Sequence, residues 1–184
     1  MKISRLREIV VALCFVLLLA LVAAKIERDA SPRLAGTFRA ADGDSLALGE
    51  ARLRLRGIDA PELVQTCTKA AKPWNCGLEA KRALAALVAD RQIECAGSQR
   101  DKYDRLLVIC SSGSLDINRE MVVKGLAVSF GDYELEEGEA RAARRGLWGS
   151  EFVVPSEWRS RLRTEGKREE PHFSSFFRGL FVVE

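Results

Sequence analysis

Histidine, tyrosine and methionine are scarce in this chain of 184 residues, with one, two and two copies respectively. The one histidine, His172, lies near the C-terminus. A mechanism that needs an imidazole base, a histidine nucleophile or a histidine-rich zinc site therefore has almost no residues to use. Any acid–base chemistry must depend on carboxylates and water.

A strong excess of charge of either sign is also missing. The 29 lysines and arginines and the 26 aspartates and glutamates give a formal net charge of +3, which is too small to indicate a polyanionic partner by itself. The length fits one domain of ordinary size with extensions. The placement of the charges, rather than their sum, must therefore indicate what the chain binds.

Long apolar runs are limited to one, IVVALCFVLLLALVAA at residues 9–24, and the basic segment MKISRLR precedes it. This pattern is typical of an export signal, and the small residues at its end offer a cleavage site. The length also fits a short membrane anchor, and a buried core helix is a further alternative. We expect residues 1–25 to be a signal peptide or membrane anchor and residues 26–33 to be a linker. The rest of the chain is then exported, either periplasmic or secreted, or held at the inner membrane by an uncleaved anchor.

The cysteines lack the CxxC spacing of a zinc knuckle. Cys14 belongs to the apolar run, which leaves an even set of four, Cys67, Cys76, Cys95 and Cys110. The first two bracket a loop with little apolar content, and the last two end apolar runs that neighbouring strands would bring together. Two disulfides are expected in an oxidising compartment, with zinc ligation or buried free thiols as the alternatives. The spacing alone leaves the pairing open.

Short strands come first in the exported part, and helices follow. The stretches RLAGTFRA, SLALGE and RLRLRGI within residues 33–58 are separated by ADGD and a glycine, as in a strand meander. Leu53 and Leu55 alternate with arginines, so the leucines should face a core. Two further strands carry the last two cysteines. Helices are expected at residues 77–91, 117–125 and 134–146. The order predicts an α+β fold built on a small barrel.

Residues 160–184 form a tail that is charged at first and then apolar. Its apolar side chains recur at helical spacing, at Phe173, Phe176, Phe177, Leu180 and Phe181. Packing back onto the domain, contact with a partner and binding to a membrane surface are the three alternatives. The last two would suit a membrane-tethered interaction protein.

Four charged or turn-forming stretches follow one another along the chain, DGDS at 42–45, RLRGIDAPE at 54–62, DKYDR at 101–105 and LWG at 147–149. Each is commonplace alone. Together, in this order and with these strands and helices between them, they resemble the thermonuclease family, the staphylococcal-nuclease-like proteins. The resemblance implies a five-stranded OB-fold barrel with about three helices over residues 34–159. It also implies a calcium-dependent phosphodiesterase that cleaves DNA and RNA to products ending in 3′-phosphate.

The resemblance assigns roles residue by residue. Asp44 and Asp59 fall on the two calcium carboxylates, and the main-chain carbonyl of Ala60 falls on the third protein ligand. Arg54 and Arg105 match the phosphate-binding arginines, and Glu62 matches the general base. The chemistry is consistent, because phosphodiester hydrolysis needs charge neutralisation at phosphorus, a positioned water and removal of its proton. Oxygen ligands suit calcium, and guanidinium groups pair with phosphate oxygens.

Other residues near these motifs have weaker assignments. Tyr103 and Tyr133 are candidates for stacking on a nucleobase, with Phe130 competing for the second position. Arg52 and Arg56 share the strand face of Arg54 and could follow the phosphate backbone or remain solvated.

One position departs from the family pattern. Asp104 stands where relatives usually carry glycine, directly before the second phosphate-binding arginine. Aspartate can adopt the turn conformation that glycine favours, but its charge is expected to weaken substrate binding. A catalytically inactive OB-fold module that binds nucleic acid at the membrane is therefore the alternative to the enzyme, and surface ion pairing is the alternative role for Arg54.

Overall fold

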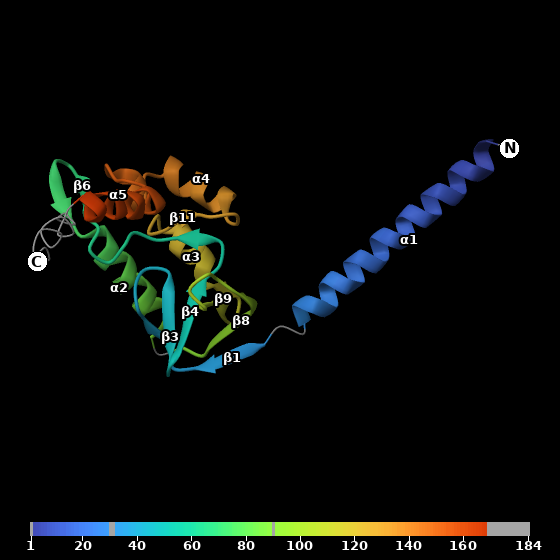
Figure 1. Cartoon of the computed structure of the whole chain (residues 1–184), viewed down its shortest axis with the longest axis horizontal. Helices are drawn as coiled ribbons and strands as arrows, with labels where there is room; N and C mark the ends of the chain where they lie inside the picture. Colours follow the sequence, from blue (N-terminus) through green and yellow to red (C-terminus); the bar gives the residue numbers. More distant parts are fainter. Residues whose placement is uncertain (1, 30–31, 90, 169–184) are drawn as a thin grey trace, which may run out of the picture.

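A computed structural model describes residues 2–29, 32–89 and 91–168 of the chain. A curled β-sheet with helices packed beside it forms the main body, and the N-terminal helix α1 (Lys2–Asp29) lies apart from that body (Figure 1). The apolar stripe expected in the C-terminal tail falls outside the described residues.

The main sheet is curled. Its strands lie in the order β1 (Arg33–Gly36), β8 (Ile93–Arg100), β9 (Leu106–Ser112), β4 (Ala51–Leu55), β3 (Ser45–Leu48) and β2 (Arg39–Ala40). The two outer strands, β1 and β2, are consecutive in the chain and separated only by Thr37 and the buried Phe38. The chain therefore brings the two outer strands near each other, and the sheet curls as expected of an OB-fold barrel.

The sheet has seven strands, because β10 (Leu115–Asp116) also pairs with β9. Five strands were expected, and the difference has a local cause. The first expected strand bends at Phe38 and becomes β1 and β2, while β10 is a short addition. The α+β class is confirmed, and so is the alternation in β4, where Leu53 and Leu55 are buried and Arg52 is exposed.

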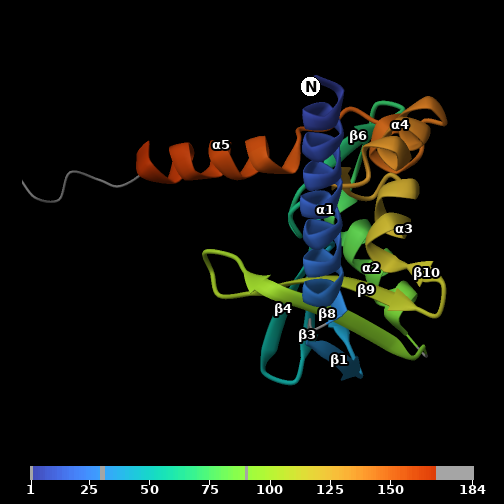
Figure 2. The same cartoon turned by 90° about the vertical axis from the view of Figure 1, so that its right-hand side faces the viewer.

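The three expected helices are present as α2 (Cys76–Val88), α3 (Ile117–Val123) and α4 (Glu134–Ala142). The apolar face of α2, with Ala80, Leu84, Leu87 and Val88, is buried in the core. A short 3-10 helix η1 (Gly146–Gly149) follows α4. A further helix, α5 (Pro155–Arg168), runs across the domain end expected at 159 and projects from the barrel (Figure 2).

Two small strand pairs connect the barrel to the helices. Strand β5 (Ile58–Asp59) pairs with β11 (Val128–Ser129), and β6 (Cys67–Lys69) pairs with β7 (Lys72–Trp74). The first pair fixes the chain directly after β4, where the charged RLRGIDAPE stretch lies.

The four cysteines of the exported part form two disulfides. Cys67 in β6 bonds Cys76 at the start of α2, and Cys95 bonds Cys110 across the β8–β9 pair. The expectation of two disulfides is confirmed, and zinc ligation and free thiols at these positions no longer apply. Cys14 is a free, exposed thiol in α1.

Helix α1 is apolar and unpacked. The window Leu6–Lys25 has a mean hydropathy of 2.6, is long enough to cross a membrane and is 0% buried. The alternative of a buried core helix is therefore wrong. An exposed apolar N-terminal helix and two disulfides suggest an exported protein.

Candidate active site

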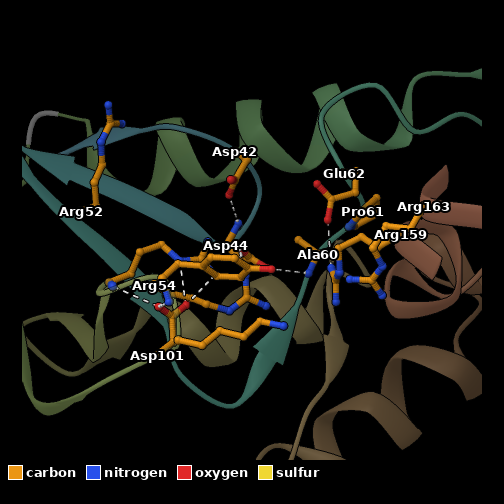
Figure 3. A pocket seen from close by; sticks show the side chains of 13 residues that line it. Asp42, Asp44, Arg52, Arg54, Ala60, Pro61, Glu62, Asp101, Arg159 and Arg163 are labelled. Atoms are coloured by element: carbon orange, nitrogen blue, oxygen red, sulfur yellow. Dashed lines mark hydrogen bonds and ion pairs between the residues drawn. The ribbon is translucent and has the colours of Figure 1, made fainter. Parts of the chain in front are cut away.

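The charged motifs meet in one open cavity of about 770 Å³. Five segments contribute to it: the turn before β3, strand β4, the loop after β5, the β8–β9 turn and helix α5 (Figure 3). The charged side chains that line it are Asp42, Asp44, Arg52, Arg54, Glu62, Asp101, Lys102, Arg105, Arg159 and Arg163. Cations therefore outnumber carboxylates on its walls.

Asp44 is placed by a tight turn. Its main-chain N–H donates to Asp42 Oδ1 at 3.0 Å, and a Cβ atom on the intervening Gly43 would lie 2.7 Å from the Cβ atoms of both Ala60 and Ala80. Only glycine allows so close a contact, so the turn packs directly against the segment after β5. Asp44 itself is buried, at 4% exposure.

Arg54 joins the two aspartates expected to hold the cation. Its Nη1 lies 2.7 Å from Asp44 Oδ1, and its Nη2 lies 2.8 Å from Asp59 Oδ1. The arginine side chain is 17% exposed and Asp59 is 1% exposed. This is a buried bridge rather than a surface ion pair, so the surface alternative for Arg54 does not hold.

The loop after β5 brings Ala60 and Glu62 to the cavity. The Ala60 N–H donates to Asp44 Oδ2 at 3.1 Å. A Cβ atom on Gly77 would lie 1.8 Å from the carbonyl oxygen of Glu62, so glycine at the start of α2 lets the helix seat this loop. Glu62 stands at the cavity wall as a result.

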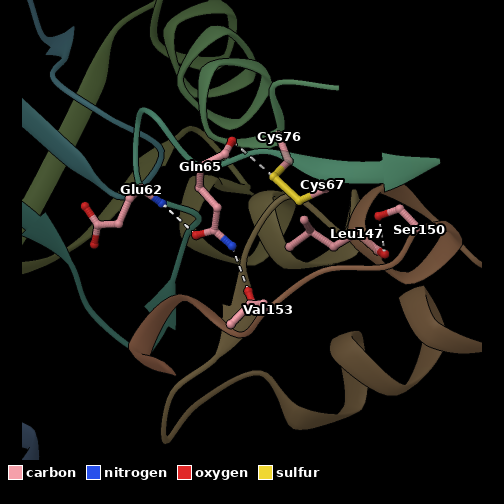
Figure 4. The surroundings of a disulfide bond; sticks show 7 residues. All are labelled: Glu62, Gln65, Cys67, Cys76, Leu147, Ser150 and Val153. Atoms are coloured by element: carbon pink, nitrogen blue, oxygen red, sulfur yellow. Dashed lines mark hydrogen bonds between the residues drawn. A yellow bond between two sulfur atoms is a disulfide. The ribbon is translucent and has the colours of Figure 1, made fainter. Parts of the chain in front are cut away.

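Gln65, which the sequence analysis did not single out, fixes the same loop by bonding both Glu62 and Val153 (Figure 4). Its Oε1 accepts the Glu62 N–H at 3.2 Å, and its Nε2 donates to the Val153 carbonyl at 2.7 Å. The side chain is fully buried, and the Cys67–Cys76 disulfide lies beside it, with Cys76 Sγ 3.4 Å from the Gln65 carbonyl oxygen. The loop that carries Glu62, called the base loop below, is thus connected to the segment that leads into α5.

Arg105 approaches from the β8–β9 turn. Its Nε and Nη2 lie 2.8 and 2.7 Å from Asp101 Oδ2, and its Nη1 donates to Ser45 Oγ at 3.4 Å. Ser45 donates in turn to Asp44 Oδ1 at 3.0 Å. Arg105 is therefore linked to Asp44 through one hydroxyl group.

The turn before Arg105 contains Asp104, which departs from the family pattern, and Tyr103, a candidate for base stacking. Asp104 has a φ of 63°, the left-handed conformation expected at a glycine position. Its carboxylate is 87% exposed and lies 3.4 Å from Arg100, and it does not line the cavity. Tyr103 does line the cavity, with Arg105 Cζ 5.5 Å from its ring centre.

Tyr133 lies elsewhere. Its hydroxyl donates to Asp116 Oδ2 at 3.0 Å, and the residue caps the start of α4 instead of lining the cavity. Burial, with help from the Asp116 charge, raises the pKa of Tyr133, so the phenol stays a hydrogen-bond donor. Phe130 is exposed outside the cavity, and Arg56 pairs with Asp132 at 3.5 Å.

Two arginines of α5, which the sequence analysis did not single out, also line the cavity. Arg159 Nη2 lies 2.9 Å from Asp59 Oδ2, and its Nη1 lies 2.9 Å from Glu62 Oε1. Arg163, one turn further along α5, also lines the cavity. The i,i+4 spacing of the two arginines in WRSRLR was the available signal.

Burial controls the charges at the centre. Burial raises the pKa of Asp44 to about 7, although Arg54 beside it acts in the opposite direction. Burial disfavours a charged guanidinium, but Asp44 and Asp59 raise the pKa of Arg54. Hydrogen bonding to Asp59 raises the pKa of Arg159. The arginines therefore stay charged, whereas Asp44 would ionise more readily beside an additional cation.

The donor atoms available here suit a hard cation. Among the described residues, no group of three or more histidine, cysteine, aspartate or glutamate side chains is arranged to hold a metal. Asp44 Oδ2 and Asp59 Oδ2 each accept one hydrogen bond, which leaves one lone pair on each for a cation. A cation held by two carboxylates would take its remaining ligands from the main chain, water and substrate, as calcium and magnesium do.

Comparison with known proteins places the chain in a family. Residues 52–150 match the family described as staphylococcal nuclease homologue. The succinoglycan biosynthesis protein ExoI of Rhizobium meliloti is 30% identical over 130 residues, which cover 66% of this chain and 68% of that protein.

Two other relatives carry names that refer to nucleases. An uncharacterized endonuclease of Escherichia coli is 30% identical over 135 residues, covering 67% of this chain and 82% of the relative. The probable staphylococcal-like nuclease CAN1 of Oryza sativa is 32% identical over 126 residues, covering 65% of this chain and 35% of the relative. Because the family match covers more than half of the chain, the protein belongs to the staphylococcal nuclease family and is a nuclease.

Proposed function

We propose that this nuclease is a calcium-dependent phosphodiesterase that hydrolyses DNA, RNA or both and leaves 3′-phosphate ends. The observation that carries the proposal is the cavity itself. Asp44, Arg54, Arg105 and Glu62 line it together, and Asp59 lies buried behind Arg54, to which it is hydrogen-bonded. A binding module without activity would not need a carboxylate base beside a pair of phosphate-binding arginines.

Asp44, Asp59 and the main-chain carbonyl of Ala60 would hold the calcium ion. When bound, the ion supplies positive charge that polarises a phosphoryl oxygen. Arg54 contacts both aspartates, which keeps the two carboxylates close despite their mutual repulsion. Arg54 therefore offsets much of the repulsion between the two carboxylates before a cation binds.

Glu62 acts on the attacking water in this proposal. The water oxygen adds to phosphorus, its proton passes to the Glu62 carboxylate, and the bond to the 5′ oxygen breaks. The 5′ oxygen takes a proton from solvent water as it leaves, and the phosphate remains on the 3′ side. The Gln65 hydrogen bonds hold the loop in place for this step.

Arg54 and Arg105 stabilise the charge that develops on the phosphate. A guanidinium group carries a delocalised positive charge and can donate two hydrogen bonds to neighbouring phosphate oxygens. Tyr103, 65% exposed at the rim, is the proposed stacking surface for a base. Tyr133, which bonds Asp116 outside the cavity, has no contact with the substrate in this proposal.

We further propose that residues 1–25 are a signal peptide or a membrane anchor, that residues 26–33 are a linker, and that the domain works outside the cytoplasm. The periplasm, the medium and the outer face of the inner membrane are all compatible with the unpacked apolar helix and the two disulfides. Residues 34–159 form the catalytic domain in this proposal, with the tail after them.

The test uses the full chain, purified under oxidising conditions in mild detergent. Single-stranded DNA, duplex DNA and RNA are incubated with calcium, magnesium or a chelator, and the end groups of the products are identified. Cleavage is expected in calcium and not in chelator. Glu62→Gln should lower the rate by about 10²–10⁴-fold, the usual contribution of a general base.

Glu94→Gln is the matched control, because Glu94 is 63% exposed and pairs only loosely with Arg33 at 3.9 Å. Its rate should equal that of the parent protein. Binding of nucleic acid with no cleavage in any metal would instead support the inactive OB-fold module.

A further inference from the structure

Helix α5 brings basic side chains to the cavity from outside the region that matches the family. We infer that α5 is a binding arm for single-stranded nucleic acid, in which Arg159 fixes the helix at the cavity and Arg163 contacts a phosphate beyond the one that is cleaved. The inference rests on the proposed function for the identity of the ligand and adds a subsite to it.

The position of α5 is the first argument. The family match ends at residue 150, and α5 begins at Pro155. Only the first turn of the helix is packed: Pro155 is buried and Trp158 is half-buried, whereas residues 160–164 are all exposed. The helix therefore projects from the domain, as Figure 2 shows. Burial of its own apolar surface does not explain its place beside the cavity.

Arg159 provides the anchor. Its guanidinium donates to both carboxylate oxygens of Asp59, at 3.0 and 2.9 Å, and to Glu62 at 2.9 Å. Asp59 is buried, so these charge-assisted hydrogen bonds are protected from solvent on one side. The segment before α5 is held independently by the bond from Gln65 to Val153. Two separate contacts thus set the direction of the helix.

Arg163 has the properties of a ligand-binding group. It lies four residues after Arg159, on the same helix face, and lines the cavity. Among the residues whose side chains the structure describes, which end at Thr164 on this helix, no carboxylate lies within ion-pair distance of it. By contrast, Arg161 points elsewhere, pairs with Glu157 at 2.7 Å and does not line the cavity.

The charges of the cavity indicate a chain of phosphates rather than a single one. In Figure 3, Arg52 stands at one side of the cavity and Arg163 at the other, with Asp44 and Arg54 between them. A mononucleotide held at the central arginines would leave the outer cations unused. A polynucleotide strand carries a phosphate at every residue and can reach both sides.

The experiment measures binding separately from cleavage. The full chain in detergent is titrated with fluorescent phosphorothioate DNA strands, which resist hydrolysis, in calcium at several salt concentrations. One strand has about twelve nucleotides and the other about three, within and below the usual footprint of an OB-fold. Arg163→Ala should weaken binding of the longer strand about fivefold and lower its salt dependence by about 0.7 in log–log slope, the value for one lost phosphate contact. The loss for the shorter strand should be smaller.

Arg161→Ala is the control, because it removes the same charge from the opposite face of the same helix. Its affinity and salt slope should match the parent protein. Equal effects of Arg161→Ala and Arg163→Ala would overturn the inference, because the charge of the helix would then act without a specific contact. Equal losses for both strand lengths would also overturn it.

Cleavage by the parent protein is scored in parallel. If the parent cleaves nucleic acid but Arg163→Ala binds the longer strand as tightly as the parent, the inference that α5 binds nucleic acid is wrong, and the proposed function is unaffected. If Arg163→Ala loses more affinity for the longer strand than for the shorter one, but the parent cleaves nothing in any metal, the inference that α5 binds nucleic acid is supported and the proposed function is wrong.

Discussion

The cavity is built by two regions that are held very differently. On the barrel side, Asp44 and Asp59 are 4% and 1% exposed, and Arg54 bridges them through short hydrogen bonds. On the helix side, α5 is packed over its first turn only, and Arg163 is exposed. The buried region is suited to holding fixed charge for chemistry, because desolvated ion pairs are strong and do not rearrange. The exposed region is suited to binding that must form and break with each substrate.

The largest expected effect is the loss of the bridge on the barrel side. Arg54→Ala should abolish detectable cleavage and lower the free energy of unfolding by about 3–5 kcal/mol, because it leaves the buried Asp44 carboxylate without its cationic partner and Asp59 with Arg159 alone. Chemical denaturation measures the stability. Arg56→Ala is the matched control, since Arg56 follows on the same strand face, is half exposed and pairs with Asp132 at 3.5 Å. Arg56→Ala should lower the free energy of unfolding by only about 0–1 kcal/mol.

If Arg54→Ala were no less stable than Arg56→Ala, the barrel side would not be the rigid region described above. Arg163→Ala sharpens the same comparison from the other side. It should leave the unfolding free energy within about 0.5 kcal/mol of the parent value, as surface substitutions usually do.

The next effect is a pH dependence that belongs to the barrel side. Burial raises the pKa of Asp44 to about 7, above the value of about 3.9 for an unfolded chain. The folded protein therefore binds a proton that the unfolded chain has lost, and this contribution to stability is present below pH ~4 and disappears as the pH rises towards 7. In chelator, the stability of the parent protein should fall over this range by up to about 1.4 kcal/mol per pH unit relative to Asp44→Asn.

Thermal or urea unfolding of both proteins between pH 4.5 and 8, at about half-unit steps, measures the difference. Added calcium should stabilise the parent more at pH 8 than at pH 5, because cation binding needs the ionised carboxylate. Parallel stability curves for the parent and Asp44→Asn would show that Asp44 does not titrate in this range.

A smaller effect is expected where the two regions are joined. Gln65→Ala removes the side chain that connects the Glu62 N–H to the Val153 carbonyl. Leaving these groups unpaired should cost about 1–3 kcal/mol of stability, and the misplaced base should lower kcat more than it raises KM. Steady-state kinetics on a single-stranded substrate separates the two constants. Gln99→Ala, in the exposed part of β8, is the control and should change neither.

The smallest effect is expected at the departure from the family pattern. Asp104→Gly removes an exposed carboxylate next to Arg105 and should strengthen nucleic-acid binding slightly at moderate salt, by about 0–1 kcal/mol. Its left-handed φ of 63° suits glycine, so the turn should be preserved. An unchanged affinity at every salt concentration would show that the outward direction of Asp104, towards Arg100, already removes its influence.

The residues of the barrel side were expected from short motifs and the family resemblance that these motifs carry. Asp44 precedes β3, Arg54 lies in β4, Asp59 ends β5 and Glu62 follows it, and pairing between β3 and β4 brings Ser45 opposite Arg54. Strand alternation and helical spacing also identified the buried leucines and the three helices. The division of one expected strand into β1 and β2 was not predicted, because a bend at Phe38 depends on the closure of the barrel.

The contacts of Tyr133 and Arg159 could not be predicted from local sequence patterns. A motif could place Tyr133 near α4 but could not show that its hydroxyl bonds Asp116. Arg159 belongs to a segment whose composition is typical of a solvated surface, and its partner Asp59 is 100 positions away in the sequence.

From short-range periodicity and turns, the sequence by itself predicted the order of the elements and the cysteines available for disulfides, while the family and the roles expected of the acidic and basic residues on the barrel side came from the resemblance carried by four short motifs. Only the tertiary structure decided that α5 joins the cavity and that Gln65 ties the base loop to it. Contacts between segments that are distant in the sequence depend on the packing of the whole domain, so a pattern of neighbouring residues does not predict them.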